Sequence, residues 1–126
     1  MPELPEVETT ARYLKERVLG ARIIDAKVLW ARSIATSSAT SFVREIVGSG
    51  IKDVFRRGKF IGISVQNTSE GFIFTHLRMS GSFDVVSQDL PVGPHDRVVL
   101  YLDNHKSIRF NDPRKFGRMY FCRDPQ

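Results

Sequence analysis

The first six residues of the sequence, Met-Pro-Glu-Leu-Pro-Glu, could supply a nucleophile and a proton donor side by side. Removal of Met1, which a small second residue such as proline generally permits, would leave Pro2 with a secondary amine at the chain terminus. The ordinary pKa of an α-amino group is about 8, so a partly desolvated amine beside a cation would be neutral and nucleophilic at neutral pH. A secondary amine can also form an iminium with the aldehyde carbon of a sugar. Pro2 is therefore a candidate for covalent catalysis, provided that Met1 is absent.

Two carboxylic acids accompany this amine in the sequence. Glu3 is its neighbour and Glu6 follows shortly after. A carboxyl group beside an amine nucleophile can protonate a ring oxygen or a leaving group and can later move protons from the imine. Alternatively, Pro2 and Pro5 could only stiffen an N-terminal arm, while the glutamates favour the positive end of the first helix. The segment alone leaves both interpretations open.

Three further clusters combine cations with aromatic or apolar residues. Residues 55–60, Phe-Arg-Arg-Gly-Lys-Phe, hold three cations in four positions, which indicates either phosphate contacts or a solvated hairpin. Residues 76–81, His-Leu-Arg-Met-Ser-Gly, resemble a strand that runs into a turn, where a lone His or Met is more often structural. Residues 109–118 place four cations and two phenylalanines around an Asp-Pro turn. This last loop suggests a nucleic-acid surface, because base stacks accept apolar wedges and phosphates accept arginine, unless its phenylalanines pack into the core.

The elements that must position these clusters are predominantly strands. Apolar residues at helical spacing predict a helix over 7–18 that stops at Gly20, and a shorter helix over about 38–47. Short β-branched or aromatic runs bounded by turn residues predict strands at 22–30, 51–56, 60–66, 72–77, 82–86, 97–102, 107–111 and 117–122. Asp103-Asn104 predicts a hairpin turn. We therefore expect an α+β, mainly antiparallel fold, either a two-layer β-sandwich or a flattened barrel, flanked by two α-helices.

Composition limits the possible classes of protein. The 126 residues fit one domain, and no segment approaches the roughly 20 apolar residues that cross a bilayer, so we expect a cytoplasmic monomer without a signal peptide. Cys122 is the single cysteine, which excludes an intrachain disulfide and predicts no metal site; we expect it to be buried in a strand. The net charge of +5 permits nucleic-acid binding. No motif for a redox or nucleotide cofactor is present.

Together these segments resemble, in order and approximate spacing, the N-terminal domain of the formamidopyrimidine-DNA glycosylase family. The opening Pro2–Thr9, Pro-Glu-Leu-Pro-Glu-Val-Glu-Thr, is similar to that family's signature, whereas the sister endonuclease VIII branch usually has Gly in place of Leu4. Lys59 in its Arg-Arg-Gly-Lys-Phe context and residues 76–81, 94–96 and 112–117 look like the other family motifs. The resemblance covers essentially the whole chain and favours the branch that acts on oxidised purines.

The resemblance implies a bifunctional DNA glycosylase and lyase of base-excision repair that acts on double-stranded damaged DNA. Pro2 would attack the anomeric carbon of the deoxyribose and displace a base such as 8-oxoguanine or a formamidopyrimidine. Glu3 would give and take protons at the sugar, and Glu6 would support the N-terminus through hydrogen bonds. Lys59 would bind a phosphate and lower the pKa of the Pro2 amine. Successive eliminations from the Pro2 iminium would then cut the strand on both sides of the sugar, without a metal.

The resemblance also implies the residues that would bind DNA. His76 would contact a phosphate, and His95 is a weaker candidate for the same role. Met79, Arg114 and Phe116 would fill the gap left by the flipped-out nucleotide, with Arg114 facing the orphaned cytosine; Lys115 would add a further contact. Flipping costs a few kcal/mol, which the inserted side chains offset.

Family members continue into a helix-two-turn-helix module and a four-cysteine zinc finger, whereas this sequence ends at Gln126 as either a shortened or a natural short form. We therefore expect no zinc, weaker DNA binding and, while Met1 is retained, little glycosylase activity. Two rivals remain. A non-catalytic DNA-binding module would bind without regard to damage and survive Pro2→Gly, and a tautomerase with an N-terminal proline would turn over a small keto-enol substrate.

Overall fold

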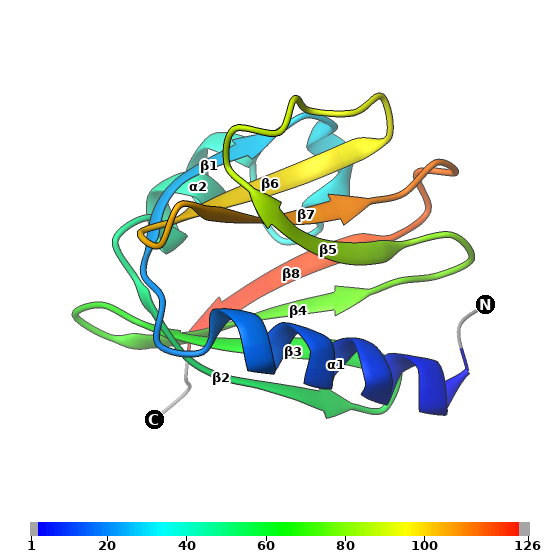
Figure 1. Cartoon of the computed structure of the whole chain (residues 1–126), viewed down its shortest axis with the longest axis horizontal. Helices are drawn as coiled ribbons and strands as arrows, with labels where there is room; N and C mark the ends of the chain where they lie inside the picture. Colours follow the sequence, from blue (N-terminus) through cyan, green and yellow to red (C-terminus); the bar gives the residue numbers. More distant parts are fainter. Residues whose placement is uncertain (1–2, 124–126) are drawn as a thin grey trace.

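Strands with alternating buried and exposed residues build two four-stranded antiparallel sheets in the computed structural model, which describes residues 3–123 (Figure 1). The strand order is β1-β6-β7-β5 in one sheet and β2-β3-β4-β8 in the other. The elements are α1 (Leu4–Val18), β1 (Ile23–Val28), a 3₁₀ turn η1 (Ala31–Ser33), α2 (Ala39–Ile46), β2 (Gly50–Arg57), β3 (Phe60–Gln66), β4 (Glu70–His76), β5 (Ser82–Ser87), β6 (Asp96–Leu102), β7 (Lys106–Asn111) and β8 (Arg118–Arg123).

One hydrophobic core joins both sheets and both helices. The sheets remain separate layers, so the predicted sandwich is confirmed and its alternative, a flattened barrel, is not formed. The core residues come from alternate positions of the strands, for example Ile61, Ile63 and Val65 of β3. Cys122 differs from the prediction, because it lies in β8 as expected but is exposed.

The first helix begins at Leu4, three residues before the predicted start at Val7. Proline is tolerated in the first turn of a helix, because the amide hydrogen that it lacks would have no partner there. The predicted apolar face is confirmed: Val7, Ala11, Leu14 and Val18 are buried. This face covers β2 and β3, and an ion pair between Lys15 Nζ and Asp53 Oδ1, 3.0 Å apart, also joins the helix to β2.

The loops at one end of the sandwich bring the predicted clusters together. In Figure 1 the start of α1, the β2–β3 turn, the β4–β5 loop and the β7–β8 loop all lie at the right-hand end, whereas the β6–β7 hairpin lies at the left. That hairpin is the predicted turn; Asn104 Oδ1 accepts a hydrogen bond from the Lys106 amide at 3.1 Å. We call the right-hand end the loop end.

Candidate functional site

The start of α1 places two glutamates at the loop end. Pro2, the predicted nucleophile, lies outside the described residues. Glu3 is exposed, and its carbonyl accepts hydrogen bonds from the Glu6 and Val7 amides, each at 3.0 Å. The Glu6 side chain turns back, so that Oε1 accepts a hydrogen bond from the Glu3 amide at 3.0 Å. Glu6 therefore fixes the residue that follows Pro2, and the Glu3 carboxyl is accessible from solvent.

The three cations of residues 56–59, at the β2–β3 turn, each have a different environment. Arg56 is bonded to α1 and to its own turn: its Nε lies 3.1 Å from Glu8 Oε1 of α1, and its Nη1 donates to the Gly58 carbonyl at 2.9 Å. Gly58 has a φ of +60°, which favours glycine and closes the turn. Arg57 lies over aromatic rings on the outer face of the sheet. Lys59 is left at the tip of a turn that Arg56 ties to α1.

His76, the last residue of β4, lies beside this turn as a neutral hydrogen-bond donor. Its ring packs edge-on against Phe60, with centroids 5.1 Å apart, and its Nδ1 accepts a hydrogen bond from the Arg78 amide at 3.1 Å. Burial lowers the pKa of His76 below 6.5, and the positive charges of Arg78 and Lys59 lower it further. The neutral ring therefore carries its hydrogen on Nε2, where it can be donated to a phosphate.

Met79 and Phe116 expose large apolar side chains at the loop end. Their exposed fractions are 52% and 47%, and with Arg78 and Arg118 they line a surface cavity of about 430 Å³. The backbone of Arg78 has a φ of +59°, an uncommon conformation for a residue with a side chain, and it turns the chain sharply just before Met79. Exposed apolar side chains of this size, next to cations, are typical of a surface that meets a partner.

The β7–β8 loop adds two cations to these apolar groups. The Arg114 guanidinium carbon lies 5.4 Å from the centroid of the Phe116 ring, so the cation packs against the aromatic side chain. Lys115 turns the other way; its Nζ lies 4.2 Å from the centroid of Trp30, the single tryptophan of the chain. The structure therefore brings Arg114 and Phe116 together with Met79, and it gives Lys115 an aromatic partner within the protein.

The β4–β5, β5–β6 and β7–β8 loops are joined by one buried residue. Asp112 accepts a hydrogen bond from the Ser80 hydroxyl, and its amide donates to the His95 carbonyl at 2.9 Å. His95 is exposed, and this contact runs through its backbone. Sequence reasoning missed Asp112 and Ser80, because they are 32 positions apart and Asp-Pro by itself indicates only a turn.

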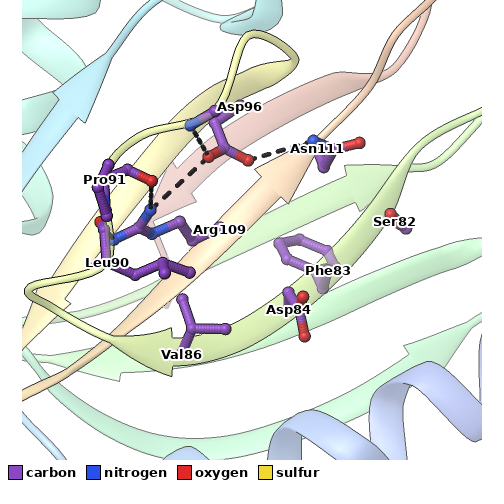
Figure 2. A pocket seen from close by; sticks show the side chains of 10 residues that line it. Ser82, Phe83, Asp84, Val86, Leu90, Pro91, Asp96, Arg109 and Asn111 are labelled. Atoms are coloured by element: carbon purple, nitrogen blue, oxygen red, sulfur yellow. Dashed lines mark hydrogen bonds and ion pairs between the residues drawn. The ribbon is translucent and has the colours of Figure 1, made fainter.

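Two residues of the 109–118 cluster belong to the interior and do not face a partner. Phe110 is fully buried, and Arg109 is 2% exposed. In Figure 2 the Arg109 guanidinium lies beneath the β5–β6 loop, where it donates to the carbonyls of Leu90 and Pro91 and pairs with Asp96 at 3.7 Å. Arg114, Lys115 and Phe116 are exposed, as a partner surface requires, whereas Phe110 packs into the core, which is the alternative that the sequence left open, and Arg109 is buried with it. A loop covers the outer face of β7, which the local sequence does not reveal.

Six cations at the loop end have no acidic partner among the described residues. Within residues 3–123, the acidic side chains pair with Arg12, Lys15, Arg17, Arg56, Arg109 and Arg123. The cations of the loop end form no such ion pair there: Arg57, Lys59, Arg78, Arg114, Lys115 and Arg118. Cations without acidic partners beside exposed apolar side chains fit a polyanion that also presents flat bases.

In the described part of the chain, no three His, Cys, Asp or Glu side chains come together as metal ligands. No helix there is both long enough and apolar enough to cross a membrane.

Comparison with known proteins gives a consistent family. The formamidopyrimidine-DNA glycosylase N-terminal domain matches residues 1–119. The chain is 38% identical over 125 residues to the formamidopyrimidine-DNA glycosylase of Protochlamydia amoebophila, covering 98% of this chain and 45% of that protein. It is 41% identical over 119 residues to the enzyme of the same name from Herpetosiphon aurantiacus, covering 94% of this chain and 43% of the relative.

Solved structures agree with the sequence match. Lactococcus lactis Fpg in complex with DNA containing an abasic site superposes with a TM-score of 0.91 at 30% identity, over 99% of this chain and 45% of that one. The same bacterial protein bound to DNA containing formamidopyrimidine-dG gives a TM-score of 0.90 over 98% of this chain. The chain spans less than half the length of the curated relatives that it matches. Sequence and fold together show that the chain belongs to the formamidopyrimidine-DNA glycosylase family and corresponds to its N-terminal domain.

Proposed function

We propose that this chain is the catalytic part of a bifunctional DNA glycosylase and lyase that removes oxidised purines during base-excision repair. The observation that carries the proposal is the loop end, where exposed Met79 and Phe116, unpaired cations and the start of α1 lie together. The names of the relatives and the damaged DNA in the Lactococcus lactis complexes support a DNA substrate. Such a substrate would place the enzyme in the cytoplasm, with the nucleoid if the host is bacterial.

The catalytic step begins with the amine of Pro2 once Met1 has been removed. The Pro2 nitrogen forms a bond to the anomeric carbon of the damaged nucleotide, and the bond from that carbon to the base breaks. Glu3, exposed at the start of α1, supplies a proton at the sugar and removes protons in the eliminations that follow. Glu6 keeps Glu3 in place through the bond to its amide. Lys59 binds a neighbouring phosphate and adds a positive charge that favours the neutral amine.

Recognition of the damaged nucleotide depends on the loops. His76 donates its Nε2 hydrogen to a phosphate, and the exposed His95 is a weaker contact of the same kind. Met79 and Phe116 enter the base stack where the flipped nucleotide has left a gap, and Arg114 faces the unpaired base. Lys115 contributes to phosphate binding from the same loop.

Borohydride trapping on a duplex with 8-oxoguanine opposite cytosine tests the chemistry. A chain that intact mass shows to begin at Pro2 is expected to form a covalent adduct with the DNA, because borohydride reduces the iminium. The matched control is the same chain with Gly-Ser added before Pro2, which turns the amine into an amide and should abolish the adduct. Equal trapping of both chains, or none with the free amine, would contradict the proposed chemistry.

A second candidate function is a non-catalytic DNA-binding module, which the exposed Met79 and Phe116 beside cations would serve without any chemistry at Pro2. It predicts no adduct even with a free Pro2 amine, together with binding that ignores damage and survives Pro2→Gly. The tautomerase considered from Pro2 alone has no support in the comparisons.

A further inference from the structure

Asp112, at the end of β7, lies at the centre of the three loops that carry the candidate DNA contacts. It is 1% exposed. Its Oδ1 accepts a hydrogen bond from the Ser80 hydroxyl at 2.5 Å, and its Oδ2 accepts one from the Gly117 amide at 2.6 Å. Ser80 Oγ in turn accepts a hydrogen bond from the Arg114 amide at 3.1 Å. One carboxylate therefore joins the β4–β5 loop, which carries Met79, to both arms of the β7–β8 loop.

The backbone of Asp112 bonds to the third loop, the β5–β6 loop that carries His95. Its amide donates to the His95 carbonyl at 2.9 Å, and its carbonyl accepts a hydrogen bond from Arg97 Nε, also at 2.9 Å. The Lys115 amide donates to the same carbonyl at 3.2 Å, which closes the turn between Asp112 and Lys115. Every described polar atom of Asp112 is thus bonded to one of the three loops.

Close packing against Phe110 restricts the positions that the β4–β5 and β7–β8 loops can take. Phe110 fills the space below, and both neighbouring loops reach it through glycine. A Cβ atom on Gly117 would lie 2.5 Å from Phe110 Cζ and 2.9 Å from Asp112 Oδ2. A Cβ atom on Gly81 would lie 2.5 Å from the Leu77 carbonyl oxygen and 3.0 Å from the Phe110 ring. The loops therefore lie directly on a buried ring, with Asp112 bonded between them.

We propose that Asp112 is a positioning residue that holds the loops of Met79, His95 and Arg114–Phe116 in one arrangement before DNA is bound. The proposal rests on the proposed function, in which Met79, Arg114 and Phe116 enter a gap in the duplex. Loops that are already ordered lose less conformational entropy on binding, so the insertion is favoured. The phosphate contacts proposed at Lys59 and His76 lie outside these three loops, whereas those at His95 and Lys115 lie within them. Loss of the Asp112 contacts should therefore weaken recognition of the gap more than it weakens non-specific binding.

Two substitutions weaken the network without adding bulk. In Asp112→Asn the amide oxygen can still accept from Gly117, but the NH₂ group offers Ser80 a neutral donor in place of a charged acceptor, so the charge-assisted hydrogen bond is lost. Ser80→Ala removes the link between the loops and keeps the Asp112–Gly117 bond. Ser80→Thr retains the hydroxyl and should restore the link. Ser82→Ala is the matched control, since Ser82 is exposed two residues further on and its hydroxyl makes no hydrogen bond within residues 3–123.

Affinity for two duplexes gives the first readout, one with a tetrahydrofuran abasic analogue opposite cytosine and one intact. Asp112→Asn and Ser80→Ala are expected to reduce the preference for the abasic duplex by about tenfold, the factor associated with one charge-assisted hydrogen bond. Affinity for the intact duplex should fall by less. Ser80→Thr and Ser82→Ala should keep the preference of the natural sequence.

Trp30 fluorescence gives a second readout that requires no DNA. Because Lys115 covers the ring of this single tryptophan, a loosened β7–β8 loop should make Trp30 more accessible to acrylamide. Asp112→Asn and Ser80→Ala should increase quenching toward the value of Lys115→Ala. Ser80→Thr and Ser82→Ala should not.

The outcomes separate this inference from the function on which it rests. If the natural sequence and Arg114→Ala bind both duplexes alike, the loops have no role in recognising damage, and both proposals are wrong. If the natural sequence prefers the abasic duplex, Arg114→Ala loses that preference, and folded Ser80→Ala keeps both the preference and the Trp30 signal, only the positioning role is overturned. A parallel loss of affinity for both duplexes would also overturn it, because it would indicate general misfolding. Ser80→Ala decides the question if Asp112→Asn does not fold.

Discussion

At the scale of single residues, the candidate site depends on side chains whose neighbours determine their chemistry. Glu6 would be an ordinary first-turn acid, but its bond to the Glu3 amide makes it the support of the residue that follows Pro2. His76 keeps its neutral form because burial and two nearby cations disfavour the charged form, while the Arg78 amide occupies Nδ1. This leaves one ring nitrogen as a donor. The sequence indicates Glu6 and His76 as candidate site residues. It cannot predict their hydrogen bonds, because these depend on how the folded chain places their neighbours.

The lowered pKa of His76 leads to a prediction about binding and pH. In the free protein the group titrates below 6.5, so the ring is neutral at neutral pH. A phosphate beside Nε2 would favour the charged ring and raise its pKa in the complex, so that binding takes up a proton. Affinity for duplex DNA should therefore rise as the pH falls from about 7.5 to about 5.5, the range in which histidine titrates. Fluorescence anisotropy at constant ionic strength measures this rise.

The control for this prediction is a second histidine at the opposite end of the molecule. His76→Gln should flatten the pH dependence, whereas His105→Asn, in the exposed β6–β7 hairpin, should leave it intact. The stability of the free protein should change with pH in the opposite direction to its DNA affinity. The unfolded chain takes up the His76 proton more readily, so the free energy of unfolding should fall as the pH drops through this range. An equal pH dependence in all three proteins would show that His76 does not contact a phosphate.

At the scale of elements, the sequence predicts where strands lie better than which strands pair. All eight strands and both helices lie within a few residues of their predicted positions, because Gly, Asn, Asp and Pro mark most of their ends. The order β1-β6-β7-β5 could not be read locally, since β1 and β6 are separated by more than half of the chain. The same limit explains the error at β7. Arg109 indicates an exposed position in an alternating strand, but the distant β5–β6 loop covers that face.

Arg109 provides the prediction at this scale. Its guanidinium bonds the Ser107 hydroxyl and the carbonyls of Ser87, Leu90 and Pro91, and pairs with Asp96. Arg109→Ala should lower the free energy of unfolding by about 3 to 5 kcal/mol, because Asp96 and the carbonyls would lose a buried partner. Urea denaturation followed by circular dichroism measures the change. Arg32→Ala, an exposed matched control, should stay within about 0.5 kcal/mol, and a similar small effect at Arg109 would mean that the β5–β6 loop does not depend on it.

At the scale of the whole molecule, six cations without acidic partners among the described residues lie beside the exposed apolar side chains of the loop end. The net charge of +5 says little by itself, but the acidic side chains that form ion pairs neutralise cations along α1, the edge of β2 and the end of β8. The six cations of the loop end keep their charge for a partner. The proposed function assigns Lys59, Arg114 and Lys115 among these cations to contacts with DNA.

The salt dependence of binding to an intact duplex tests this distribution. Each phosphate contact releases counterions, so the slope of log affinity against log salt concentration is about −0.9 for each contact. Lys59→Ala should make the slope shallower by about one unit, because the lysine at the β2–β3 turn then no longer meets a phosphate. Lys106→Ala is the matched control; this exposed lysine lies at the β6–β7 hairpin, at the opposite end of the sandwich, and the slope should not change. Anisotropy titrations over a series of salt concentrations give both slopes. Equal slopes for the two variants would mean that DNA does not approach the loop end, and would place the phosphate contacts elsewhere on the surface.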